Sequence, residues 1–298
     1  MQKPTLSTLL LILLFGISPT FGQIQQLRKQ LEQIAVAYDG KLGIAIKDLS
    51  GKDTVSLNGQ GHFAMQSVYK FHLALAVLQQ VDKGKFKLEQ KILVKKKDLL
   101  PNTHSPLRDK YPNGEIEIPL SEILKYTVSL SDNNGCDILF RLLGGPKVVD
   151  TYLKNIGIKN VAVVATEEEM HQDEKIQFTN WSTPWSATQL LEKFYQKKLL
   201  SPSSHEFLWK TLVETSTGAN KLKGLLPAGT VVGHKTGYSG SNSQGIIAAT
   251  NDIGIVQLPN GKHYAIAVFY GGTKLNMNDS DRVIAEVSKA AWDYFLGK

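Results

Sequence analysis

The strand patterns of this 298-residue chain lie close to its two ends, whereas its middle carries helical patterns. Near the start, alternating apolar residues at 42–46 and an extended stretch at 54–57 are separated by turn residues, which predicts a β-hairpin. Three more strand patterns follow near the end, at 230–235, 245–256 and 263–270. Because strands must pair with other strands, we expect a single five-stranded antiparallel sheet built from both ends of the chain.

Helical patterns flank and separate these strands. Apolar residues recur at helical spacing over 24–38 and 283–295, which predicts a helix at each end of the chain. The middle holds six more helical patterns and almost no strand signal: 68–80, 120–126, 132–143, 148–156, 187–195 and 204–213. We therefore predict an α+β fold in one unit, with an α/β lobe from 23–62 and 215–298, an all-helical lobe from 63–214, and a cleft between them.

The first 22 residues are typical of a secretory signal peptide. Lys3 precedes an apolar run at 9–17, and small residues stand three and one positions before Gln23. A buried or membrane-spanning helix is the alternative, but the run is much shorter than the ~20 residues that a bilayer requires. The residue immediately after the cleavage point is Gln23 and not a cysteine that could carry a lipid, so we expect the mature chain, 23–298, to be exported without a membrane anchor.

Composition excludes several classes of function. Lys and Arg outnumber Asp and Glu by 34 to 27, but they are scattered and form no basic stripe with aromatic residues, so we expect no nucleic-acid partner. The seven histidines form no H-x-H or H-E-x-x-H pair, which indicates no metal site. The single cysteine, Cys136, stands among apolar residues and fits a small buried side chain.

A serine and a lysine three residues apart begin the first central helical pattern. That spacing puts Ser67 and Lys70 on one helix face, so their side-chain ends can meet. A serine hydroxyl needs an adjacent base to become a nucleophile, and a lysine with a lowered pKa can accept its proton. By itself the pair fits a helix-capping serine followed by a surface lysine better than a catalytic pair, and it is the two further motifs that favour catalysis.

Two further short motifs follow the pair at wide separation. Ser131-Asp132-Asn133 stands where one helical pattern gives way to the next, as a capping pair would. It also suits a site in which Ser131 passes a proton to a leaving nitrogen, Asn133 holds a substrate amide and Asp132 braces the loop. An SDN tripeptide arises by chance about once in 8000 positions.

The third motif places three different groups along one strand. Lys235, Thr236 and Gly237 supply a cation, a hydroxyl and a backbone without a side chain, which suits binding of a carboxylate and of an extended acyl group. The alternative is a strand that ends at a glycine turn.

In order and spacing, the three motifs resemble those of class A serine β-lactamases, and the likeness covers essentially the whole mature chain. Residues 65–67, 131–139 and 222–227 are most similar to the PER-type and VEB-type extended-spectrum branch. The resemblance implies a two-lobed fold of the serine β-lactamase and penicillin-binding-protein kind. It also implies a periplasmic monomer that hydrolyses penicillins and cephalosporins without a cofactor.

The resemblance also implies a glutamate that activates the water for deacylation. Glu167 fits this role, and Glu168 or Glu169 would serve if the alignment slipped. Without the family likeness, three adjacent glutamates would be interpreted as a solvated acidic patch. Whether Lys70 or Glu167 is the base for acylation stays open.

Several positions depart from the family pattern. Ala165 and Asn180 replace the arginine and aspartate that most class A enzymes pair across this loop, so that salt bridge cannot form. His171 replaces an asparagine that helps to hold the water, and it either substitutes for that residue or simply packs. His104 stands where relatives often carry an aromatic residue at the cleft entrance, or it is an ordinary surface histidine.

Two more departures concern the substrate carboxylate and the oxyanion hole. Tyr238 follows the KTG motif, and its backbone N–H is expected to complete an oxyanion hole with that of Ser67. Gln244 stands where many relatives have a carboxylate-binding arginine, and Lys221 is a candidate replacement.

Two other classes of protein stay open, and the first of them shares all three motifs. A penicillin-binding protein would be acylated and then stall. A lactam-binding sensor would be expected to carry a membrane segment, and the mature sequence shows none.

Overall fold

The computed structural model describes residues 19–297 and contains the predicted five-stranded antiparallel sheet, in the order β2-β1-β10-β9-β8. Its strands are β1 (Lys41–Asp48), β2 (Thr54–Leu57), β8 (Val232–Tyr238), β9 (Thr250–Gln257) and β10 (His263–Gly271). The strand predicted at 245–256 begins five residues late, because Ile247 makes only isolated bridges to Ser241 and Thr273. At the edge of the sheet, β8 begins two residues later than predicted and continues beyond Lys235 through the rest of the KTG motif.

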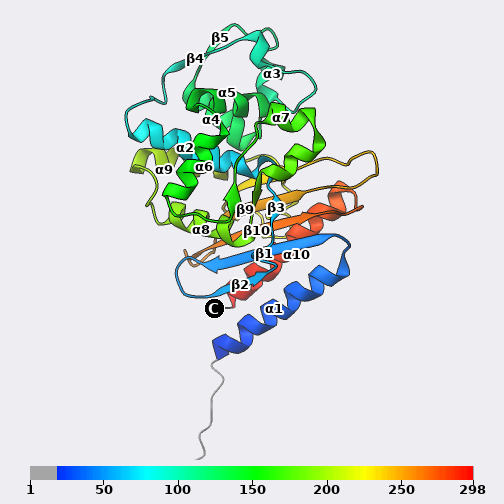
Figure 1. Cartoon of the computed structure of the whole chain (residues 1–298). Helices are drawn as coiled ribbons and strands as arrows, with labels where there is room; N and C mark the ends of the chain where they lie inside the picture. Colours follow the sequence, from blue (N-terminus) through cyan, green and yellow to red (C-terminus); the bar gives the residue numbers. More distant parts are fainter. Residues whose placement is uncertain (1–18, 298) are drawn as a thin grey trace, which may run out of the picture.

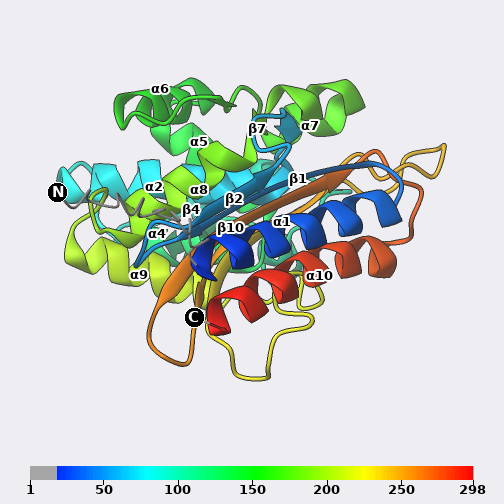
Figure 2. The ribbon, with the colours of Figure 1, turned by 90° about the horizontal axis from the view of Figure 1, so that it is seen from below.

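The two terminal helices cover one face of this sheet. Helices α1 (Pro19–Ala37) and α10 (Met277–Leu296) run side by side across it, as Figures 1 and 2 show from two directions. Leu27 and Leu31 of α1 pack with Val283 and Val287 of α10 in a core that also includes residues of β1 and β10. Residues 1–18, which hold most of the predicted signal peptide, lie outside the described residues.

The second lobe consists mainly of helices packed around α2 (Tyr69–Asp82), whose residues 69–78 are all buried. A helix with no solvated face must lie at the centre of a domain. Around it lie α3 (Pro106–Lys110), α4 (Leu120–Ser129), α5 (Asn133–Leu143), α6 (Pro146–Asn155), α7 (Glu167–Gln172), α8 (Pro184–Tyr195) and α9 (Pro202–Val213). Short 3₁₀ turns are η1 (Gln66–Val68), η2 (Lys96–Asp98) and η3 (Glu174–Thr179).

The prediction that this lobe is entirely helical was wrong. Strands β3 (Phe63–Ala64), β6 (Val161–Ala162) and β7 (Trp181–Ser182) form one small sheet, and β4 (Lys91–Val94) pairs with β5 (Ile116–Pro119). Two-residue strands are too short to show any alternation of apolar and polar residues. Helix α8 packs against β1 and β10, and one continuous apolar core joins this lobe to the second face of the large sheet.

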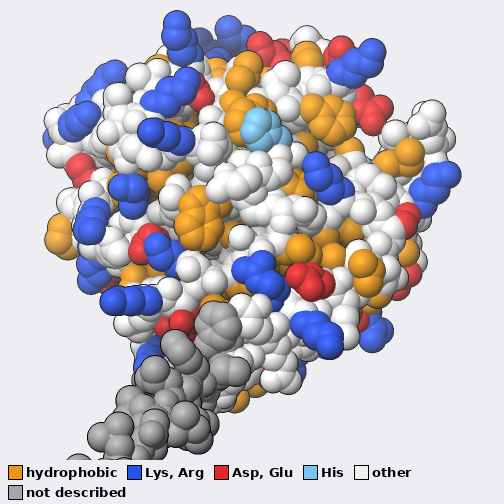
Figure 3. All heavy atoms as spheres, turned by 60° about the horizontal axis from the view of Figure 1, so that its bottom comes forward, with side chains coloured by type: hydrophobic (Ala, Val, Ile, Leu, Met, Phe, Trp, Pro, Cys, Tyr) orange, Lys and Arg blue, Asp and Glu red, His pale blue; other side chains and the backbone are white. Residues whose placement is uncertain are grey.

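No helix within residues 19–297 is long and apolar enough to cross a membrane. On the face shown in Figure 3, Lys and Arg side chains are more numerous along the left side than on the right, with acidic and uncharged groups among them.

Candidate active site

Ser67 lies in the 3₁₀ turn η1, immediately before α2. Its hydroxyl is not used as a helix cap, since neither η1 nor α2 has a side-chain cap. Instead, the Lys70 ammonium donates to Ser67 Oγ at 2.9 Å. The three-residue spacing thus brings the two groups together, and the interpretation of Ser67 as a simple capping residue is excluded.

The Lys70 ammonium contacts four other residues of the site. This fully buried group also donates to the Ser131 carbonyl at 2.8 Å and to Asn133 Oδ1, and it pairs with Glu167 Oε1 at 3.0 Å. A buried ammonium requires such partners, because isolating it from water is costly. Lys70 therefore contacts the hydroxyl of Ser67 and a carboxylate at the same time.

The SDN motif forms the loop that leads into α5, as the sequence indicates. Asp132 caps this helix by accepting from the Gly135 N–H at 2.7 Å, and it also accepts from the Leu107 N–H at 2.6 Å. Ser131 adopts a positive φ of 59°, a conformation that is uncommon outside glycine. The buried carboxylate of Asp132 holds this loop in place.

The KTG motif approaches from the edge of the large sheet. Lys235 is fully buried, and its ammonium donates to Ser131 Oγ at 2.9 Å. Burial, with a smaller contribution from the Lys70 charge, lowers the pKa of Lys235 to about 7. A continuous chain of contacts therefore runs from Ser67 through Lys70 and Ser131 to Lys235.

Gly237 is required for this close approach. A Cβ added there would lie 2.5 Å from the Met65 carbonyl oxygen, so only glycine lets β8 pack against the nucleophile turn. Asn251, paired with Gly237 across the sheet, donates its amide to the Ala64 and Met65 carbonyls at 2.8 and 3.0 Å. The end of β8 is thus fixed relative to Ser67.

Glu167 is the one of the three adjacent glutamates that reaches Lys70. Glu169 completes a capping box with Thr166, and Glu168 is exposed. The backbone N–H groups of Glu167 and Glu168 both donate to the buried Asp137 carboxylate at 2.9 Å. The arrangement places the Glu167 carboxylate inward and favours it over the two alternatives.

The loop that carries Glu167 is held without the salt bridge used by most class A enzymes. Asn180 Oδ1 accepts from the Val164 and Ala165 N–H groups at 2.7 and 2.9 Å, and its amide donates back to the Ala165 carbonyl at 2.8 Å. Gln66, beside the nucleophile, donates to Gln177 at 2.5 Å. Hydrogen bonds from neutral amide side chains thus hold both sides of this loop in place.

An open cleft of about 280 Å³ lies over these groups, and the predicted site residues Ser67, Asn133, Glu167, His171 and Tyr238 contribute to its lining. His104 does not line it, because its ring nitrogen Nε2 lies 2.9 Å from the Leu130 carbonyl and the preceding Thr103 takes its place. No group of His, Cys, Asp and Glu suited to a metal ion occurs between residues 19 and 297.

Lys221 does not fit the role of a carboxylate-binding substitute for arginine. Its ammonium is buried, paired with Asp281 Oδ1 at 2.5 Å and hydrogen-bonded to Thr250. An ammonium held in a buried ion pair is not free to bind a substrate.

Asp137, which holds the backbone at Glu167 and Glu168, was not identified by the sequence analysis. It lies one helical turn after Asn133 on α5, so the two polar side chains share a face of this largely buried helix. That pattern is the sequence signal from which a role for Asp137 in the site could have been predicted. The signal is weak, because an acidic residue on a helix usually indicates a face exposed to solvent.

Burial, and then the neighbouring Glu167 charge, raises the pKa of Asp137 to about 7. A carboxyl whose pKa is raised on folding adds stability at low pH that is lost as the pH rises through that folded value. We therefore expect the unfolding temperature of the wild type to fall more than that of Asp137→Asn between about pH 5 and pH 8. Thermal melts across this range test the expectation, and parallel curves for the two proteins would contradict it.

Comparison with known proteins agrees with this geometry. The sequence profile of the β-lactamase enzyme family matches residues 26–295. The chain belongs to the β-lactamase enzyme family. It is 44% identical to β-lactamase VEB-1 of Pseudomonas aeruginosa over 97% of both chains, and 42% identical to the extended-spectrum β-lactamase PER-1 of the same species over 99% of this chain and 95% of that one.

Solved structures give the same result. The TLA-1 extended-spectrum β-lactamase superposes with a TM-score of 0.90 at 50% identity, covering 92% of this chain and 99% of that one. The likeness to the PER and VEB branch and the two-lobed α+β fold are confirmed. This class A β-lactamase hydrolyses β-lactam antibiotics and so confers resistance, as the sequence predicts.

Proposed function

We propose that this β-lactamase works through an acyl-enzyme on Ser67. Ser67 Oγ bonds to the lactam carbonyl carbon and gives up its proton to Lys70 in its neutral amine form, or to Glu167 through a water. The carbonyl oxygen takes on negative charge between the backbone N–H groups of Ser67 and Tyr238. When this intermediate collapses, the ring C–N bond breaks and Ser131 delivers a proton to the nitrogen.

Hydrolysis of the acyl-enzyme follows. Glu167 removes a proton from a water that attacks the ester carbon, and the proton returns to Ser67 as the C–O bond breaks. The observation that carries this proposal is the position of Lys70, whose ammonium lies 2.9 Å from Ser67 Oγ and 3.0 Å from Glu167 Oε1. The nucleophile and the deacylating carboxylate thus share one partner.

The remaining groups suit recognition of the substrate. Lys235 and Thr236 anchor the substrate carboxylate, Asn133 holds the amide of its acyl side chain, and His171 and Tyr238 border that side chain. We propose penicillins and cephalosporins as substrates, with an extended spectrum like the one that the names of PER-1 and TLA-1 state for those enzymes. Hydrolysis rates for both classes, measured on purified protein together with acyl-enzyme lifetimes, test this proposal.

The same proposal covers the location and state of the protein. We propose that residues 1–22 direct export to the periplasm and are removed, and that the mature enzyme acts as a monomer. Mass spectrometry of the exported protein would show a chain that begins at Gln23 if cleavage follows Gly22.

Lys235 is expected to set the alkaline limb of the pH profile. Because the pKa of Lys235 is lowered to about 7, its ammonium loses its charge as the pH rises through that value and holds a substrate carboxylate less well. We expect kcat/KM for a penicillin to fall above about pH 7, since kcat/KM reports the free enzyme. Lys235→Arg, which stays charged, should remove this limb. An unchanged profile in that variant would assign the limb to another group.

A further inference from the structure

A second, larger cavity borders the catalytic cleft. It has a volume of about 620 Å³ and lies between the large sheet, the segment 173–178 and the loop that joins β8 to β9. Glu174 lines both spaces, but Ser67, Lys70, Glu167 and Lys235 do not line this one. Its volume lies within the usual range for small-molecule sites.

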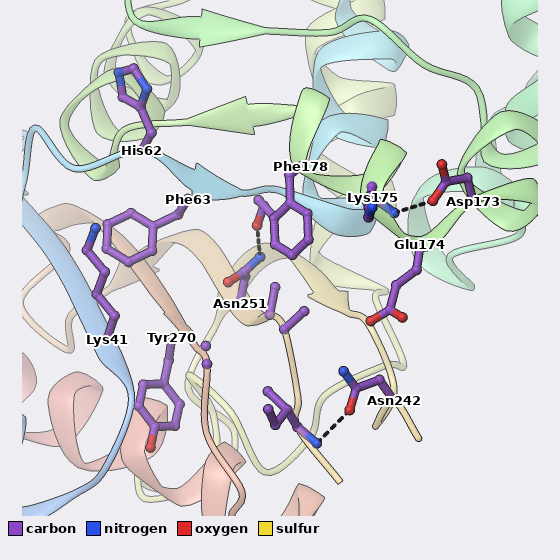
Figure 4. Close-up of a pocket in the computed structure, with 16 residues that line it drawn as sticks. Lys41, His62, Phe63, Asp173, Glu174, Lys175, Phe178, Asn242, Asn251 and Tyr270 are labelled. Carbon is purple, nitrogen blue, oxygen red and sulfur yellow. Dashed lines mark hydrogen bonds between the residues drawn. The ribbon is translucent and has the colours of Figure 1, made fainter. Parts of the chain in front are cut away.

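The walls of this cavity combine aromatic rings with small residues. Phe63, Phe178 and Tyr270 stand around it in Figure 4. Phe178 is 52% exposed, which is unusual for so large an apolar side chain. Small residues leave space in part of the remaining wall: Ala64, Ala248, Ala249, Gly271 and Gly272. Flat apolar groups can therefore bury surface against these rings.

Charge is divided across the cavity. On one side, the Lys41 ammonium lies 5.2 Å from the centre of the Phe63 ring and makes no ion pair with any residue of 19–297. The other side carries Asp173 and Glu174 together with Lys175, so that two carboxylates face one ammonium there, as Figure 4 shows. An anionic group is thus attracted more strongly toward Lys41 than toward the opposite wall.

Asn251 adds a hydrogen-bond acceptor to the wall. The residue is 1% exposed, and its amide nitrogen donates hydrogen bonds to the Ala64 and Met65 carbonyls. Its oxygen has no partner within the described part of the chain, and Figure 4 shows it turned toward the side that holds Phe63 and Lys41. A buried acceptor without a donor is costly, so a ligand N–H that reaches it gains binding energy.

We propose that this cavity is a second binding site, for a small aromatic carboxylate that carries an N–H donor. The ring lies against Phe63 and Phe178, the carboxylate pairs with Lys41, and the donor bonds to Asn251. This site lies beyond the catalytic machinery, and an occupant would border the cleft at Glu174.

The test is calorimetric titration of the mature protein with indole-3-acetate, which supplies a ring, an N–H and a carboxylate. We expect millimolar or tighter binding that weakens about fivefold in Lys41→Met, the size of one ion pair at a partly exposed site. Lys52→Met, which removes an exposed lysine outside the cavity, should bind like the wild type. Naphthalene-1-acetate, which has no N–H, should bind about fivefold more weakly than indole-3-acetate.

Three results would overturn this assignment. They are no binding at millimolar probe, equal losses in Lys41→Met and Lys52→Met, and loss of binding in Lys235→Ala, which would place the probe in the catalytic cleft. Equal affinity for the two probes would remove Asn251 from the site. Ser67→Ala should bind the probe normally, so failure here is distinguishable from failure of the acyl-enzyme mechanism.

Discussion

Ser67→Ala is expected to abolish β-lactam hydrolysis, with kcat/KM for a penicillin falling about 10⁵- to 10⁶-fold, as when other serine hydrolases lose their nucleophile. The reason is that Lys70, Ser131 and the oxyanion donors all act on a bond that Ser67 must first form. The loss of lactam absorbance measures turnover, and mass spectrometry of the intact protein should detect no adduct.

Ser50→Ala is the matched control, because this serine lies in the exposed turn between β1 and β2. It should retain wild-type turnover. An adduct of penicillin mass on the Ser67→Ala protein would show that a different hydroxyl is acylated. The proposed mechanism would then fail even though the family assignment would stand.

Glu167→Gln is expected to separate the two halves of the reaction. Without its general base, the hydrolysis of the acyl-enzyme should slow about 10³-fold, while the ester still forms. Intact-protein mass spectrometry after minutes with a penicillin should show a persistent adduct on Ser67 that the wild type lacks. Steady-state turnover equal to that of the wild type would remove Glu167 from deacylation.

Glu168→Gln is the control for register, because this neighbouring glutamate is exposed and it is Glu167 that pairs with Lys70. It should hydrolyse penicillin at the wild-type rate, and a trapped adduct on the Glu168→Gln protein would assign the deacylation role to Glu168.

The rate of adduct formation in Glu167→Gln also tests which residue is the base for acylation. Formation at the wild-type rate would assign that role to Lys70, and slow formation would assign it to Glu167.

Most of the fold was predictable from periodic patterns. The large sheet and its terminal helices follow from alternation and helical spacing sustained over eight or more residues in most of these elements. The small sheets of the helical lobe were not predictable, since β3, β6 and β7 have two residues each. Their pairing depends on neighbours more than a hundred residues away for β3.

Part of the site was equally predictable from the sequence. The distance between Ser67 and Lys70 is local, because three residues on a helix fix it, and the sequence therefore placed that pair. The contact between Lys235 and Ser131 joins residues 104 positions apart, so only folding could establish it. Folding also decided the places of His104 and Lys221. Their positions in the family pattern predict residues of the cleft, but His104 contacts the Leu130 carbonyl and Lys221 pairs with Asp281.

The sequence by itself determined the class of fold, the three motifs and the family, because these depend on residue type and local spacing. Tertiary structure alone decided which glutamate faces Lys70, that amides of Asn180 replace a salt bridge, and that Asp137 lies buried beneath the Glu167 loop. The physical reason is that burial and charge pairing arise only when distant segments exclude water from one another, and no local pattern records that exclusion.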